Sequence, residues 1–207
     1  MNKAKIRLSK KEQQMVQDAD VILTKNQIMQ KARLLLELLQ QDFIGYLRSD
    51  RINVPEEIKM SVPKISRGEN YLGLPYLILD YPRRFNMEST FAIRTMFWWG
   101  NFFSITLHLS GSYKSSYEKN IIGWYPILKK EKYFININDD QWEHHFEKSN
   151  YTKVDTISKA AFEKNIRENI FLKIAYKIPL SKWDKTAEKL FRQFKMLSGI
   201  AGQLPSR

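Results

Sequence analysis

The stretch Phe91-Ala-Ile-Arg-Thr-Met-Phe-Trp-Trp-Gly-Asn-Phe-Phe-Ser-Ile-Thr-Leu-His-Leu109 predicts a β-hairpin that turns at Gly100-Asn101. Glycine and asparagine tolerate the positive φ angles that a two-residue turn requires. The β-branched and aromatic residues on both sides suit strands whose faces are at least half buried. Sixteen of the 27 aromatic residues lie between Tyr71 and Phe134. We therefore expect a β-sheet at the centre of the fold.

Helical patterns stand at both ends of the chain. Ser9 and Glu12 form a capping box that predicts a helix over residues 10–23, and Thr24 with Gln27 predicts a second helix that continues to about residue 47. Ser181 caps a final helix with an apolar face and a basic face, which ends at Gly199. Shorter helical segments are expected over residues 139–149 and 156–168.

Further strands are expected around the hairpin, at residues 62–66, 71–81, 133–138 and 170–178, with a turn at 67–70. Alternation in the last strand predicts one solvated face, which carries Lys173 and Lys177. Helices at both ends of a run of hairpin-linked strands are typical of an α+β fold. We expect an antiparallel sheet of about five strands packed against the N-terminal and C-terminal helices. The length of 207 residues favours a single domain over residues 1–207, in which residues 1–8 form a flexible basic tail.

Composition excludes several classes of protein. The chain has no cysteine, so it holds no disulfide and no thiolate nucleophile. The basic N-terminus is followed by polar residues, unlike a signal peptide, and no stretch approaches the ~18 apolar residues of a membrane span. We expect a cytoplasmic protein.

The net charge is +12, from 34 Lys and Arg against 22 Asp and Glu. This excess favours an anionic partner such as a nucleic acid or an anionic surface. It is spread along the chain, however, and 23 of the 34 basic residues are lysines, which are typical of a solvated surface.

A two-residue turn would place alternate hairpin residues on a common face. With that register, Trp98 pairs with Phe103 and Arg94 with Leu107 on the core face. The opposite face would mix aromatic walls with a few polar groups, as ligand pockets do. The ligand-binding candidates on that face are Thr95, Phe97, Trp99, Ser104, Thr106 and His108. Arg94 on the core face is a further candidate, because its charge there needs a carboxylate or an anionic ligand. A face packed partly on a helix explains the same pattern, and a slip of one residue would exchange the two faces.

Arg94 and His108 are also the candidates for catalysis. A guanidinium on an apolar face needs a carboxylate or an anionic ligand, and Asp80 and Glu88 are the nearest acids in sequence. An imidazole can serve as a general acid or base. No nucleophile accompanies the pair, so a salt bridge and a hydrogen-bonded structural histidine are the competing interpretations.

Two other segments carry candidate sites. On a helix, Asp140 and His144 would share a face and could hold a metal ion, although acids at a helix start need no ion to explain them. The basic loop residues form a candidate nucleic-acid surface, for which a solvated turn is the alternative. These residues are Arg83, Arg84, Lys129, Lys130 and Lys132.

The chain lacks the phosphate-binding loops, nucleophile elbow and zinc-binding helix motif of familiar nucleotide-dependent and hydrolytic enzymes. We therefore favour a cytoplasmic binding module without a cofactor, which uses the aromatic hairpin face for an anionic or aromatic small molecule or a protein partner. A nucleic-acid-associated protein and an unfamiliar enzyme centred on Arg94 and His108 are the alternatives.

Overall fold

The computed structural model describes residues 6–49 and 54–202. Contacts divide the chain into two compact units, residues 1–35 and 36–207. The expected flexible tail lies outside the described residues up to residue 5, and residues 6–8 are exposed. The expected single-domain organisation stays a prediction.

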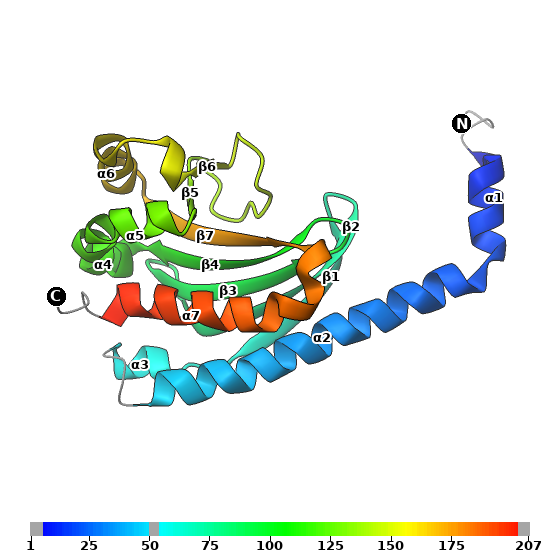
Figure 1. The fold of residues 1–207 in the computed structure, drawn as a ribbon, viewed down its shortest axis with the longest axis horizontal. Helices are drawn as coiled ribbons and strands as arrows, with labels where there is room; N and C mark the ends of the chain where they lie inside the picture. Colours follow the sequence, from blue (N-terminus) through cyan, green and yellow to red (C-terminus); the bar gives the residue numbers. More distant parts are fainter. Residues whose placement is uncertain (1–5, 50–53, 203–207) are drawn as a thin grey trace. The chain divides into compact units, whose positions relative to one another are not determined.

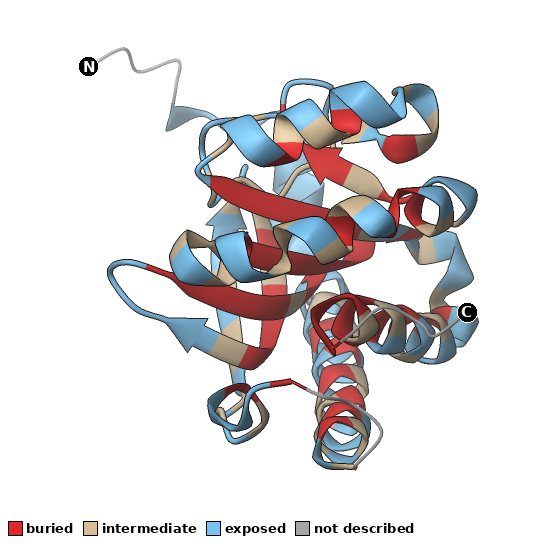
Figure 2. Cartoon of the chain, turned by 90° about the vertical axis from the view of Figure 1, so that its left-hand side faces the viewer, coloured by how far each residue is buried: buried red, intermediate tan, exposed pale blue. Residues whose placement is uncertain are grey.

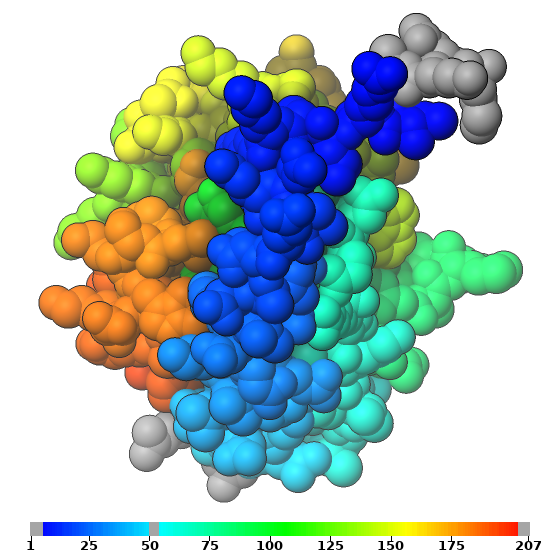
Figure 3. Space-filling view, turned by 90° about the vertical axis from the view of Figure 1, so that its right-hand side faces the viewer, coloured from blue at the N-terminus to red at the C-terminus, as the bar shows by residue number. Residues whose placement is uncertain are grey.

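The first unit is helical. It contains α1 (Lys10–Gln17) and the first part of α2 (Ala19–Arg48). The Ser9–Glu12 capping box is confirmed, because both of its side-chain bonds are present. The predicted helix boundary at Thr24 is wrong: the break falls at Asp18, whose carboxylate accepts a hydrogen bond from the Asp20 amide and so starts α2 there. No residue of α1 is buried, and Figure 3 shows the atoms of this helix and of early α2 in blue.

The second unit contains the sheet. Within the described residues, seven antiparallel strands lie in the order β1-β2-β3-β4-β7-β5-β6 (Figure 1). The α+β fold is confirmed, with seven strands rather than about five. The strands are β1 (Lys64–Tyr71), β2 (Leu74–Phe85), β3 (Thr90–Trp98), β4 (Phe102–Ser110), β5 (Phe134–Asn136), β6 (Tyr151–Lys153) and β7 (Phe171–Pro179).

The helices of this unit come before, between and after the strands. After the end of α2 they are α3 (Glu56–Lys59), α4 (Gly111–Gly123), α5 (Tyr125–Lys130), η2 (Val154–Thr156), α6 (Lys159–Glu168), η3 (Leu180–Lys185) and α7 (Thr186–Gly202). In the described part of the chain, no helix is both long and apolar enough to cross a membrane.

Two further local predictions are wrong. The turn expected at residues 67–70 lies at Leu72-Gly73, where both residues have positive φ angles and the Asn70 side chain accepts from the Gly73 amide. The helix expected over residues 139–149 is absent. Residues 137–150 instead form an irregular connection, which we call the β5–β6 loop.

The hairpin is confirmed, but its expected register is wrong. Trp98 pairs with Phe102 and Arg94 with Thr106, so the connection holds three residues, Trp99 to Asn101, rather than two. Because side chains alternate along a strand, this slip of one residue moves all of β4 to the other face relative to β3. Arg94 therefore shares a face with Ser104, Thr106 and His108, whereas Thr95 and Phe97 lie on the opposite face.

One face of the sheet carries the helical core. α4 and α7 pack against β3 and β4, and Trp183 of η3 lies 5.8 Å from the Phe97 ring and 5.2 Å from the Phe103 ring. Phe43 of α2 stacks on Phe194 of α7 with 3.8 Å between ring centres. The central strands are buried along most of their length (Figure 2). We call the other side of the sheet, on which Arg94 lies, the loop face.

Candidate functional site

The register assembles the loop face from five neighbouring strands, β3, β4, β7, β5 and β6. Trp98 pairs with Phe102, which pairs with Pro179 on β7, and Ser104 pairs with Lys177. Farther along, Phe134 of β5 pairs with both Ala175 and Lys153. Since paired residues share a face, aromatic residues and three lysines, Lys153, Lys173 and Lys177, lie in rows on this side of the sheet.

The β5–β6 loop is fixed to this face by Tyr71 and Lys173. The Tyr71 hydroxyl donates to the Glu143 carboxylate at 2.7 Å and accepts from the amides of His144 and His145 at 2.7 and 3.0 Å. The Lys173 ammonium donates to the carbonyls of Gln141 and Glu143 at 3.1 and 2.5 Å. An irregular loop has few backbone partners of its own, so these bonds supply them.

Lys173 occupies an unexpected position. The alternation along β7 predicts a solvated face at this residue, but only 2% of Lys173 is exposed, because the loop covers it. Burial, with the Arg94 charge as the second cause, lowers the pKa of Lys173 to about 8, while Asp140 and Glu143 act in the opposite direction.

Arg94 has the carboxylate partner that the sequence suggested. Its guanidinium makes two bonds to Asp80, at 2.7 and 3.0 Å, and both side chains are largely buried. Its Nη1 also donates to Nε2 of His144 at 3.2 Å. A buried bidentate pair of this kind compensates the charge on each partner.

His108 lies beneath the same loop. Its Nε2 is 3.2 Å from the Gln141 side-chain oxygen, which can only accept, so this nitrogen carries the proton. Burial, followed by the charges of Lys173 and Arg94, lowers the pKa of His108 to about 3. The imidazole is therefore neutral at physiological pH and is used as a hydrogen-bond donor.

The remaining hairpin candidates are not gathered in one place. Ser104 and Thr106 are buried on the loop face with Arg94 and His108, while Thr95 and Phe97 are buried on the helix-covered face. Trp99 lies in the hairpin connection. The common face expected for Thr95, Phe97, Trp99, Ser104, Thr106 and His108 is therefore wrong, because it depended on the two-residue turn. Whether any of them binds a ligand stays a prediction.

The metal and nucleic-acid candidates are also placed. Without the expected helix, Asp140 and His144 lose their common face: Asp140 accepts from the Trp142 amide, and His144 faces the Arg94 guanidinium.

The nucleic-acid candidates make separate contacts. The backbone amide of Arg83 donates to the Ser61 hydroxyl, and its side chain donates to the Val62 carbonyl. Burial raises the pKa of Tyr113, and the nearby Arg84 opposes this effect. Lys129 lies over the Tyr125 ring on α5, followed by Lys130 and Lys132. The contacts of the arginines and of Lys129 thus involve different elements.

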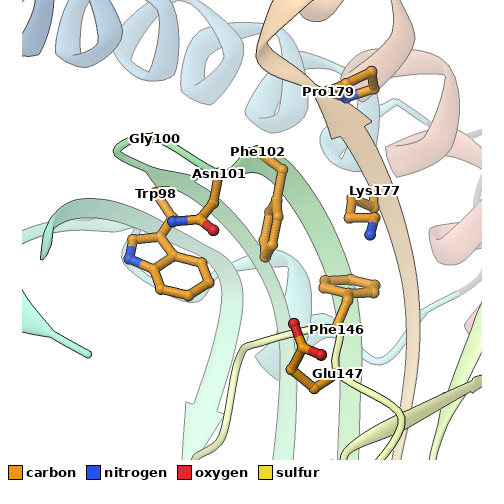
Figure 4. Close-up of a pocket in the computed structure, with 8 residues that line it drawn as sticks. All are labelled: Trp98, Gly100, Asn101, Phe102, Phe146, Glu147, Lys177 and Pro179. Carbon is orange, nitrogen blue, oxygen red and sulfur yellow. The ribbon is translucent and has the colours of Figure 1, made fainter. Parts of the chain in front are cut away.

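Two hollows flank the β5–β6 loop. The first, which we call the hairpin hollow, has a volume of about 400 Å³ and lies beside the hairpin connection, lined by Trp98, Asn101, Phe102, Phe146, Glu147 and Lys177 together with Gly100 and Pro179. Figure 4 shows side chains from three adjacent strands with Phe146 and Glu147 of the loop beside them.

The second, which we call the lysine hollow, has a volume of about 510 Å³. Its basic residues are Lys148, Lys153 and Lys177, its apolar residues are Phe134, Ile137, Phe146 and Tyr151, and Thr152 and Thr156 complete the lining. Both volumes fall in the range of small-molecule sites, roughly 300–1,000 Å³.

Lys177 and Phe146 line both hollows. The Lys177 ammonium lies 5.7, 5.6 and 5.3 Å from the ring centres of Phe102, Phe134 and Phe146. Aromatic faces attract a cation, so these rings hold the charge in place without neutralising it. Among the described residues, no carboxylate forms an ion pair with Lys177.

Only part of the signal for these hollows is present in the sequence. Alternation along β7 indicated that Lys177 is exposed, and the density of aromatic residues indicated the hairpin. The pattern over residues 139–149 instead predicts a helix, so it does not reveal that Phe146, Glu147 and Lys148 lie between two hollows. Comparison of the chain with known protein families, curated proteins and solved structures found no significant match to any of them.

Proposed function

We propose that the protein is a cytoplasmic binding module that holds an anionic small molecule with an aromatic or apolar body in the lysine hollow. The observation that carries this proposal is the composition of the lining. Of the described residues that line the hollow, three are lysines and none is acidic, and the rest are aromatic and aliphatic residues and two threonines. Apolar walls supply affinity, and a few charged groups select the ligand and orient it.

The state of Arg94 and His108 supports binding rather than catalysis. Arg94 is engaged by Asp80, and His108 is a neutral donor to Gln141 beneath the loop. Groups that are buried and already bonded are poorly placed to exchange protons with a substrate. Their contacts help to hold the loop that forms a wall of both hollows.

Phenyl phosphate tests the proposal because it combines an anionic group with an aromatic ring. In calorimetric titration at low salt we expect saturable binding at one site. Replacement of both Lys148 and Lys153 by alanine should weaken binding about tenfold, since an exposed ion pair contributes up to roughly 1 kcal/mol. Binding should also weaken as salt screens the charges.

Lys159→Ala/Lys164→Ala is the matched control. These lysines lie on α6 with 61% and 71% of their side chains exposed, and their removal changes the net charge by the same amount. We expect this variant to bind phenyl phosphate as the unaltered protein does. Absence of binding to the unaltered protein, or equal weakening in the two variants, would contradict the proposal.

A further inference from the structure

The two hollows differ in charge although they share a wall. Lys177 lines both, so the difference lies in the residues that they do not share: Glu147 in the hairpin hollow, and Lys148 and Lys153 in the lysine hollow. Glu147 and Lys148 are neighbours in sequence, which means that the loop presents an acid on one side of Phe146 and a base on the other. The electrostatic potential must therefore change along the line that joins the hollows.

The Glu147 carboxylate is available to a ligand. Glu147 is exposed, its backbone amide bonds to the His145 ring at 3.3 Å, and its carbonyl accepts from the amides of Asn150 and Tyr151. These backbone bonds fix the position from which the side chain extends. Among the described residues, no basic side chain forms an ion pair with this carboxylate.

Phe146 connects the hollows through an aromatic surface. Its ring lies 5.0 Å from the Phe102 ring on the hairpin side and 4.9 and 4.7 Å from the Phe134 and Tyr151 rings on the lysine side. An aromatic group of a ligand that extends from one hollow to the other can pack along this row of rings.

We propose that the hairpin hollow is a second subsite of the same binding site, and that the ligand is an elongated molecule with an anionic group at one end, an aromatic segment, and an ammonium group at the other end. The anionic end lies in the lysine hollow, the aromatic segment beside Phe146, and the ammonium group at Glu147. This assignment rests on the proposed function of the lysine hollow and adds the polarity of the ligand.

Tyramine phosphate and 4-ethylphenyl phosphate separate the two subsites. Both carry a phosphate on an aromatic ring and have similar lengths, but only tyramine phosphate ends in an ammonium group. We expect tyramine phosphate to bind about three- to fivefold more tightly in calorimetric titration, the range of an exposed ion pair. Glu147→Gln should remove this preference and leave the affinity for 4-ethylphenyl phosphate unchanged.

Glu168→Gln is the control, because it removes a carboxylate whose side chain is 65% exposed on α6, and it should preserve the preference. Equal affinity of the two compounds, or a preference that survives Glu147→Gln, would overturn the second subsite while leaving the lysine hollow in place. Failure of both compounds to bind would overturn the proposed function itself, and the second subsite with it.

Discussion

Two buried histidines couple the stability of the fold to pH. Burial is the largest cause that lowers the pKa of His108 to about 3 and of His144 to about 2, from the usual 6.5. Between pH 6.5 and these lowered pKa values, the unfolded chain binds protons that the folded chain does not. The free energy of unfolding therefore falls as the pH falls below about 6.5. From pH 7 to pH 5 we expect a loss of about 2 kcal/mol for each histidine. Measured by urea unfolding, the free energy of unfolding of His108→Gln should fall less between these two pH values than that of the unaltered protein. An equal fall in the two proteins would contradict this account.

Two glycines with positive φ angles differ in the space around them. Gly100 has φ +71° and open space where a Cβ would lie, whereas Gly111 has φ +56° and a Cβ there would lie 2.1 Å from the Glu88 carbonyl oxygen. Gly100→Ala should therefore cost only the backbone strain of about 1–2 kcal/mol. Gly111→Ala must also displace a backbone segment, and we expect a larger loss of unfolding free energy. Equal denaturation midpoints for the two variants would show that the segment before β3, which contains Glu88, can shift to make room for a Cβ at residue 111.

At the level of elements, the β5–β6 loop depends on Tyr71 for its position. Tyr71→Phe removes the acceptor for two loop amides and the donor to Glu143. We expect faster hydrogen exchange at the amides of His144 and His145 and a loss of about 1–3 kcal/mol of unfolding free energy, because buried amides are left without partners. The control is Tyr76→Phe, which removes the hydroxyl of a neighbouring ring whose centre lies 6.2 Å from that of Tyr71. Unchanged exchange in Tyr71→Phe would show that the other contacts of the loop, such as those of Lys173, hold it without Tyr71.

Local patterns predicted the elements more reliably than their register or their cover. The Ser9–Glu12 box and the hairpin around Gly100-Asn101 rest on neighbouring residues, and both are present, although the hairpin connection also includes Trp99. The three-residue hairpin connection depends on how β2, β3 and β4 pair, and no single strand encodes that choice. The same limit applies to Lys173, which alternation places on a wet face, whereas a loop more than 20 residues away in sequence buries it. The hollows depend on that loop, so they could not be derived from periodicity.

At the scale of the whole molecule, the charge of +12 is a diffuse property and the lysine hollow is a local one. Diffuse charge gives weak binding to nucleic acid that falls steeply with salt, because each neutralised phosphate releases counterions. We expect duplex DNA to bind at low salt only. Lys148→Ala/Lys153→Ala and Lys159→Ala/Lys164→Ala each remove two positive charges, so they should weaken DNA binding slightly and equally, as measured by fluorescence anisotropy. If the Lys148/Lys153 variant alone lost DNA binding, the hollow would belong to a nucleic-acid interface, because a binding surface that depends on two lysines out of 34 basic residues is a site rather than a consequence of net charge.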